Sequence, residues 1–172
     1  MTLSKARTLN GHRLEGFDRV MGKVKECHFD GRHWTILYLA HDRENPRDFF
    51  QDGKMWDAQL RSTYGVSGHQ IQALDGELGL AEDYIIDEET WVIRYLIIDA
   101  NDWWPGKKIL LSPEWIERIN WSERKAYVNL SRETIKQSPE YMEESRLTRD
   151  YEIGLHQHYN RRGYWNNELA AR

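Results

Sequence analysis

The sequence predicts a mainly β protein made of two tandem units and a helical C-terminal extension. Three observations lead to this prediction. The chain is similar to itself at an offset of 57 residues, each copy contains apolar runs typical of strands, and helix-like spacing is confined to the last third. We expect the units to span 1–64 and 65–135, and the extension to span 136–172.

The internal repeat aligns 11–42 with 68–99 over 32 positions without a gap. Average residue usage gives about two identical pairs by chance over such a length. Ten are found: Gly11/Gly68, His12/His69, Asp18/Asp75, Gly22/Gly79, Asp30/Asp87, Trp34/Trp91, Ile36/Ile93, Tyr38/Tyr95, Leu39/Leu96 and Asp42/Asp99. We interpret the two stretches as copies of one small, β-rich unit.

Each copy is expected to contain a β-hairpin. In the second copy, 79–86 and 91–98 are rich in Ile, Val, Tyr and Trp and are joined by a short polar segment. In the first copy, Asp30-Gly31 occupies the turn, where glycine supplies the positive φ of tight hairpins. An earlier turn is expected at Asp75-Gly76.

The repeated aromatic residues are predicted to lie in the core, because they recur at strand spacing. They are Trp34 and Trp91, and Tyr38 and Tyr95.

Two strands and two helices are expected beyond the repeat. The strands are predicted at 108–111 and around 125–130. Between them, Ser112-Pro113 is typical of a helix cap followed by proline at the first helical position. A short helix is predicted over 131–137 and a second over about 148–159.

Composition narrows the class of protein. Residues are 40% hydrophobic and 12% aromatic, which is enough apolar surface for a core, and the net charge of −4 lacks the basic excess of non-specific nucleic-acid binding. Cys27 has no second cysteine to pair with, and no secretory leader or run of about 20 apolar residues is seen. A soluble, cytoplasmic protein without a transmembrane segment or nucleic-acid partner is expected.

Three stretches carry a resemblance to a known family. They are 75–79 (DGELG), 87–99 (DEETWVIRYLIID) and 103–113 (WWPGKKILLSP), and together they resemble the PRC-barrel family. The resemblance covers about 68–130 well, and it covers the first copy only through Asp42. Members include the cytoplasmic part of the photosynthetic reaction-centre H subunit and a domain of a ribosome maturation factor.

The resemblance implies two tandem small PRC-barrel-like β-barrels, each strongly bent, and a habit of binding other proteins. It implies no activity. We therefore expect a non-enzymatic interaction or assembly module that binds protein partners or associates with itself as a homo-oligomer. Two alternatives stay open. One is a peripheral partner of a membrane electron-transfer complex, like the H subunit, and the other is a metal-binding or enzymatic protein that uses its His-rich positions.

No catalytic, cofactor or metal site is predicted. His156 and His158 would point to different sides of a helix, so we expect solvated histidines rather than metal ligands. Cys27 is expected to be a buried or half-buried thiol. The repeated His12 and His69 are interpreted as structural residues.

Aromatic pairs in the loops and the tail define the predicted interaction surface. Two adjacent tryptophans cannot both point inward from a regular strand, and exposed aromatic residues mark binding surfaces. The surface residues expected on this basis are Phe49, Phe50, Trp103, Trp104, Tyr164 and Trp165. Cover of Trp103 and Trp104 by another part of the same chain is the alternative to exposure.

Overall fold

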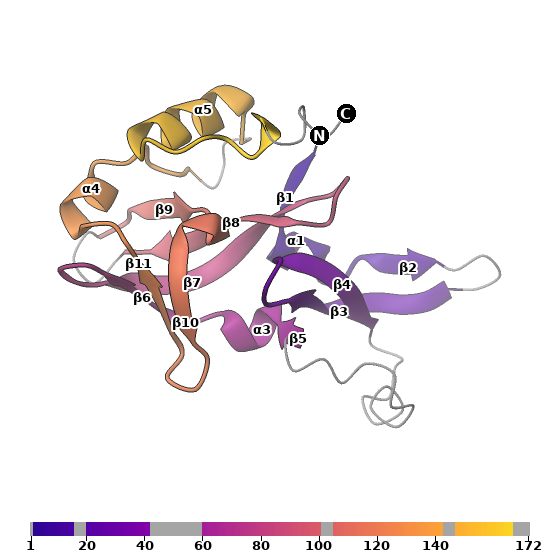
Figure 1. Ribbon diagram of the computed structural model, residues 1–172. Helices are drawn as coiled ribbons and strands as arrows, with labels where there is room; N and C mark the ends of the chain where they lie inside the picture. Colours follow the sequence, from indigo (N-terminus) through magenta and orange to yellow (C-terminus); the bar gives the residue numbers. More distant parts are fainter. Residues whose placement is uncertain (1, 16–19, 42–59, 101–104, 143–146, 167–172) are drawn as a thin grey trace.

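The computed structural model describes residues 2–15, 20–41, 60–100, 105–142 and 147–166. The described chain is mainly β, and its strands form two sheets. Figure 1 shows α4 and α5 over the larger sheet, while the smaller sheet lies at the other end of the molecule.

The larger sheet contains seven strands within the described residues, in the order β10-β11-β6-β7-β8-β9, and β1 is added against β7. Its ladders are antiparallel except the one between β11 and β6. The strands are β1 (Leu3–Lys5), β6 (Gln70–Ala73), β7 (Gly76–Asp87), β8 (Ile93–Asp99), β9 (Lys108–Leu111), β10 (Ile116–Asn120) and β11 (Lys125–Val128). The predicted strands at 108–111 and around 125–130 are confirmed as β9 and β11.

The smaller sheet is antiparallel and has four strands in the described part of the chain. Its order is β2-β3-β4, and β5 also pairs with β3. The strands are β2 (Arg13–Glu15), β3 (Val20–Asp30), β4 (Thr35–His41) and β5 (Leu60–Ser62).

Positions 57 residues apart have the same strand register in the two sheets. Leu14 lies opposite Gly22 just as Ile71 lies opposite Gly79, and the β3–β4 irregularities at 24/26 and 28/29 recur in β7–β8 at 81/83 and 85/86. Equivalent positions also share unusual backbone angles. Gly11 and Gly68 both have φ 83°, and Trp34 and Trp91 have φ 54° and 58°. Positive φ is uncommon outside glycine, so the shared angles add weight to the correspondence.

The two halves exchange their first strands. β1 precedes the first copy in the chain but pairs with β7 of the larger sheet, where Leu3 lies opposite Asp87. β5 precedes the second copy but pairs with β3 of the smaller sheet, where Leu60 lies opposite Asp30. These two pairs are themselves related by the offset of 57. β5 lies inside the predicted unit 1–64, but as the equivalent of β1 it belongs with the second copy. With the halves divided before β5, each half contributes its first strand to the sheet of the other.

Equivalent positions of the two halves meet at Thr35 and Val92. These residues form an isolated antiparallel bridge, and they are equivalent positions. Around them, the N–H of Ile36 donates to the carbonyl of Trp91, and the N–H of Ile93 donates to the carbonyl of Trp34, both at 2.7 Å. Equivalent residues thus bond to one another reciprocally, as they do in a symmetric dimer.

The helices are short, and their caps agree with the sequence. They are α1 (Ala6–Leu9), α3 (Thr63–Val66), the 3₁₀ helix η1 (Pro113–Trp115), α4 (Arg132–Lys136) and α5 (Arg149–His158). Ser112, Ser131 and Thr148 each accept a backbone N–H at the start of η1, α4 and α5. The cap at Ser112-Pro113 and the two predicted helices are confirmed. Within the described residues, no helix is long and apolar enough to cross a membrane.

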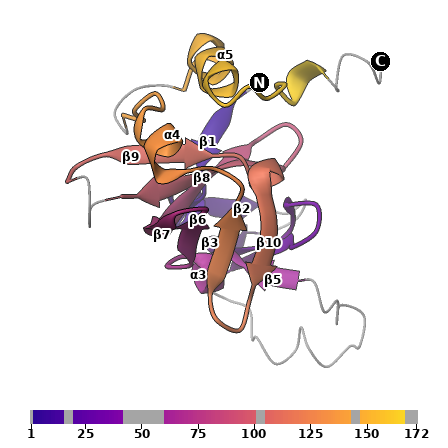
Figure 2. The same cartoon turned by 60° about the vertical axis from the view of Figure 1, so that its left-hand side comes forward.

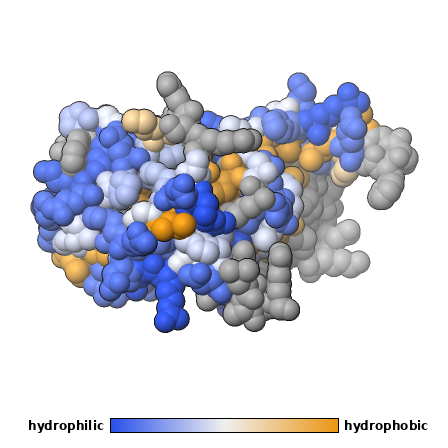
Figure 3. Space-filling model, turned by 90° about the horizontal axis from the view of Figure 1, so that it is seen from above, coloured by the Kyte–Doolittle hydropathy of each residue, from blue (hydrophilic) through white to orange (hydrophobic). Residues whose placement is uncertain are grey.

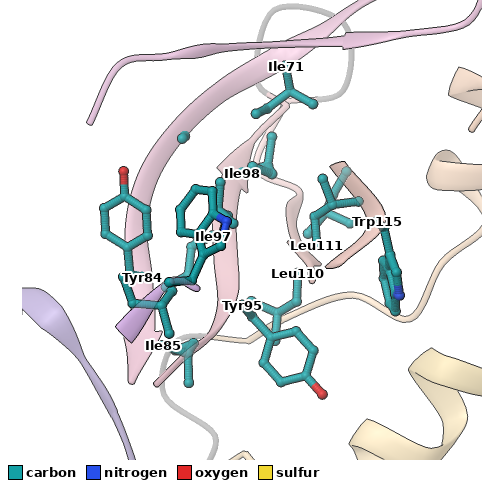
Figure 4. Close-up of a cluster of buried hydrophobic side chains, with 14 of the residues drawn as sticks. Ile71, Tyr84, Ile85, Tyr95, Ile97, Ile98, Leu110, Leu111 and Trp115 are labelled. Carbon is teal, nitrogen blue, oxygen red and sulfur yellow. The ribbon is translucent and has the colours of Figure 1, made fainter. Parts of the chain in front are cut away.

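Strand β8, which pairs with β7 and β9, is buried on both faces. Figure 4 shows Tyr95 and Ile97 in a cluster with Leu110 and Trp115, and Ile98 is fully buried as well. The structure confirms Tyr95 as a core residue. Polar and apolar residues alternate along a strand only when one of its faces is exposed to solvent. Because both faces of β8 are covered, its sequence is a nearly continuous apolar run.

Two expectations need correction. The described strands form two open sheets rather than two closed barrels, because no described ladder joins β9 to β10 and because β1 and β5 cross between the halves. Trp34 is buried, but Trp91 is 37% exposed. Trp34 stacks on Phe29 at 5.1 Å, whereas the position equivalent to Phe29 is Ile86, which has no ring to stack on. The side chain of Tyr38 lies outside the described residues.

Candidate functional site

Four of the predicted surface residues lie outside the described residues. They are Phe49, Phe50, Trp103 and Trp104. The other two, Tyr164 and Trp165, pack against the protein's own helix and sheet. Tyr164 is only 6% exposed, and Trp165 is half-buried with its ring 5.0 Å from that of His156.

A buried polar network fixes α5 to the larger sheet. The Glu152 carboxylate accepts hydrogen bonds from the hydroxyls of Tyr95 on β8 (2.9 Å) and Tyr164 (2.8 Å), and its other oxygen is 3.0 Å from Arg149. His156 Nε2 lies 3.0 Å from the Tyr95 hydroxyl, and His156 Nδ1 lies 3.0 Å from the carbonyl of Arg162. A carbonyl only accepts, so Nδ1 carries the proton.

Burial perturbs both titratable groups of this network. It raises the pKa of Glu152 above its usual value, against hydrogen bonds from the two tyrosines and the charge of Arg149, which lower it. Burial also lowers the pKa of His156, so that the neutral imidazole is favoured. The expectation of a solvated histidine is therefore wrong for His156, which is 2% exposed, because a strand tyrosine supplies its partner.

The exposed residues of α5 are the polar Asp150 and Gln157 and the apolar Ile153. Seen from above, in the view of Figure 3, hydrophilic residues cover most of the surface that is not grey, and hydrophobic residues appear between them. Tyr164 and Trp165 of the tail thus attach the extension to the rest of the protein.

A groove runs along the junction of the two sheets. One cavity of about 560 Å³ lies between the β3–β4 turn, which includes Trp34, and the segment 112–121 of the larger sheet. A second cavity of about 620 Å³ lies between β5 and the end of the β10–β11 hairpin. Trp121 lines both cavities, and Figure 2 shows β5 and the hairpin at the same end of the molecule. We call the two cavities together the inter-sheet groove.

The inter-sheet groove is rich in arginine, although the chain as a whole is acidic. Its charged lining residues are Arg32, Arg61, Arg94, Arg118, Arg124, Glu114 and Glu117. The charge of Arg94 is balanced by Asp87, a buried carboxylate 2.9 Å away. Burial alone would raise the pKa of Asp87, but hydrogen bonds from Arg94, Thr90 and a backbone N–H outweigh it and lower the pKa.

Aromatic rings support three of these arginines. The guanidinium of Arg61 lies 4.5 Å from the ring centroid of Trp121, that of Arg94 lies 4.0 Å from Tyr164, and that of Arg118 lies 3.9 Å from Tyr127. Such stacking holds a guanidinium in place. Arg94 also donates to Asp87 and Thr90, so Arg61 and Arg118 are the stacked arginines whose charge no carboxylate contact balances within the described residues.

Among the described residues, no three His, Cys, Asp or Glu side chains come together in an arrangement that could hold a metal ion. His156 and His158 point to different sides of α5 as expected, and His158 bonds to the carbonyl of Thr134. Cys27 is buried as predicted, and its burial raises the pKa of the thiol to about 11.

Sequence reasoning missed the groove because its residues come from both halves of the chain. Arg61 and Trp121 are 60 positions apart in the sequence, and neither belongs to a local motif. The only available signal was the repeated association of arginine with aromatic residues, which has no fixed spacing here.

The described chain is thus a mainly β protein with an arginine-rich and aromatic groove between two sheets. Comparison with protein-family models gave no match, and comparison with curated proteins gave none either.

Proposed function

We propose that this chain is a non-enzymatic protein-interaction module of the PRC-barrel type, built by tandem duplication, whose inter-sheet groove binds an acidic segment of a partner protein. The arginine and aromatic lining of the groove carries this proposal. Arginine, tryptophan and tyrosine are the residues most enriched among the hot spots of protein interfaces.

Charge selects the partner segment. With Arg94 neutralised by Asp87, four arginines face two glutamates across the groove, and the rest of the chain is acidic. A segment that carries Asp and Glu would be attracted to the groove and repelled from the remaining surface. Apolar side chains beside those acids would contact Trp34 and Trp121, which line the groove.

The matching registers and the reciprocal bonds at Thr35 and Val92 support the duplication. A symmetric ancestor would place the junction of its two copies on an axis, and the groove lies beside that junction. The second copy is followed by β9, β10 and β11. The segment that contains β10 forms one side of the groove, and this side has no equivalent among the described residues of the first half.

The test is binding of a fluorescent acidic peptide that contains Asp, Glu and one Phe, measured by fluorescence anisotropy. We expect binding that weakens with salt and a loss of about tenfold or more in Arg118→Glu and in Trp121→Ala. Arg13→Glu, an equal charge change on exposed β2, serves as the control. Equal losses in all three variants, or equal binding of a basic peptide, would contradict the proposal.

Self-association is the rival use of the same surface. Light scattering of the full chain distinguishes it, because a dimer that Arg118→Glu dissociates would place a second copy, rather than an acidic partner, in the groove.

A further inference from the structure

Strand β10 has one edge with no strand beside it in the described part of the chain. It pairs only with β11 there and forms one end of the larger sheet. The N–H of Ile116 bonds to the carbonyl of Pro113 at the end of η1. Apart from this bond, the backbone of β10 has no hydrogen-bond partner outside its ladder with β11 among the described residues. Such an edge presents N–H and C=O groups that can pair with another chain.

The hydrogen bonds of β11 determine which backbone groups of β10 point to the open edge. The N–H of Gln70 on β6 donates to the carbonyl of Arg124, so the backbone groups of Ala126, two residues further along, also point to β6. Ala126 lies opposite Ile119 of β10, and the two therefore form a non-hydrogen-bonded pair. The N–H and C=O of Ile119 consequently point away from β11, to the open edge.

The open edge of β10 faces the inter-sheet groove. Four consecutive residues of the strand, 116–119, line the first cavity of the groove. Side chains of a strand alternate between its two faces, so a cavity over one face would be lined by every second residue. Lining by consecutive residues places the cavity beside the strand. Because β11 occupies the other edge, the cavity lies along the edge to which Ile119 points.

The two faces of β10 differ in chemistry. Arg118 stacks on Tyr127 on one face, and its charge has no carboxylate contact within the described residues. Ile119, the next residue, lies on the opposite face and packs against the hydrophobic core. A strand added beside β10 would share these faces. Its side chains would meet a cation on one face and apolar surface on the other, in alternation.

We propose that the partner segment binds as an added β-strand on the open edge of β10, paired to the N–H and C=O of Ile119, and that its acidic and apolar residues alternate. This inference rests on the proposed function, since it takes the same acidic segment and the same groove, and it adds the binding mode and the sequence pattern of the segment. A second copy of this chain fits the edge less well, because two paired β10 strands would bring their Arg118 side chains together.

The first test compares three fluorescent peptides of one sequence, in which Glu and Val alternate, by fluorescence anisotropy with the full chain. One peptide is unmodified, one is N-methylated at every Val and one at every Glu. Successive N–H groups of a strand point to opposite edges, so only one of the two modifications removes the donors that face β10. We expect that modification to weaken binding by about tenfold or more, and the other to weaken it less. The larger loss falls on the Val peptide if the added strand is antiparallel to β10, and on the Glu peptide if it is parallel.

The second test observes the same contact from the protein. In the saturated complex, amide hydrogen exchange of Ile119 should slow by about tenfold or more, whereas that of Arg118, whose N–H points to β11, should change less. Ile119→Pro removes the outward N–H without breaking a ladder bond and should weaken binding, while Ile119→Val keeps this N–H and serves as the matched control. Circular dichroism of both variants guards against misfolding as the cause of a loss.

The outcomes separate this inference from the proposed function. No binding of the unmodified peptide would overturn both. Binding that Arg118→Glu weakens, but with equal affinities of the two methylated peptides, would support the proposed function and overturn strand addition, because the backbone of the segment would then make no one-sided contact. Unchanged exchange of Ile119 in the saturated complex would overturn strand addition as well.

Discussion

Two buried tyrosines provide a matched test of what hydrogen bonds contribute to this fold. Tyr95 is fully buried, and its hydroxyl contacts Glu152 at 2.9 Å and His156 at 3.0 Å. Tyr84 is equally buried, but its hydroxyl has no partner in the described chain. Replacing either residue by phenylalanine keeps the ring and its apolar contacts, so the difference between the variants isolates the hydroxyl.

The expected cost follows from the contacts that are lost. Hydrogen bonds to charged or strongly polar groups contribute about 1.5–3 kcal/mol each, and groups left unpaired in the core add a penalty. Glu152 keeps Tyr164 and Arg149 as partners. The single proton of the Tyr95 hydroxyl serves one acceptor at a time, Glu152 or His156 Nε2, so Tyr95→Phe removes one hydrogen bond together with the 3.0 Å polar contact to His156. We therefore expect Tyr95→Phe to cost about 2–3 kcal/mol and Tyr84→Phe less than about 1 kcal/mol.

Urea unfolding, monitored by circular dichroism and tryptophan fluorescence, measures both values. A shifted midpoint at an unchanged slope would identify the loss as one of stability. Amide hydrogen exchange should localise the effect of Tyr95→Phe to α5, since Glu152 and His156 attach that helix. Equal costs for the two variants, or a cost below about 0.5 kcal/mol for Tyr95→Phe, would refute this reasoning.

Two further predictions concern glycine positions and pH. A Cβ on Gly79 would lie 2.1 Å from the carbonyl oxygen of Asp99, so Gly79→Ala should lower the stability of the fold by about 3 kcal/mol or more. A Cβ on Gly154 of α5 would meet no neighbouring atom, so Gly154→Ala should raise the stability by roughly 0.5–1 kcal/mol. Thermal melts that rank the two variants in the other order would contradict this geometry. Because burial lowers the pKa of His156, the unfolded chain binds a proton that the folded chain refuses as the pH falls through 6.5, and stability should decline there. The raised pKa of Glu152 has the opposite effect on stability above pH 4.5, because there the folded chain binds a proton that the unfolded chain does not. The loss of stability that belongs to His156 is therefore the part that disappears in His156→Gln. Urea midpoints at about pH 7.5 and about pH 5.5 measure it.

Local signals in the sequence predicted local structure well. Ser112-Pro113 predicted η1, and Asp75-Gly76 predicted the turn between β6 and β7. The positive φ predicted at Gly31 is wrong, because in the β3–β4 turn the positive φ falls on Trp34, at 54°. The repeat predicted that residues 57 positions apart occupy equivalent places in the fold, and the strand registers of β3–β4 and β7–β8 agree with this prediction. These features depend on neighbours in the chain or on comparison of the chain with itself.

The exchange of β1 and β5 could not be predicted in the same way. Each strand has three residues and lies before the aligned block, and Leu3 and Leu60 are the only identical pair between them. Strand pairing depends on backbone groups, which every residue carries, so a short strand leaves little trace in side-chain patterns. The groove escaped prediction for a related reason, because it forms only when the halves meet.

The exchange of β1 and β5 links the two halves even when the chain between them is cut. After cleavage between β4 and β5, the first fragment would carry β1, which pairs with β7 of the second, and the second would carry β5, which pairs with β3 of the first. Two three-residue ladders would thus still join the fragments. Either fragment produced alone would lack the strand that pairs with its β3 or β7. The backbone groups of that strand would then form an open sheet edge that is prone to aggregation. The two halves therefore depend on each other to cover their strand edges.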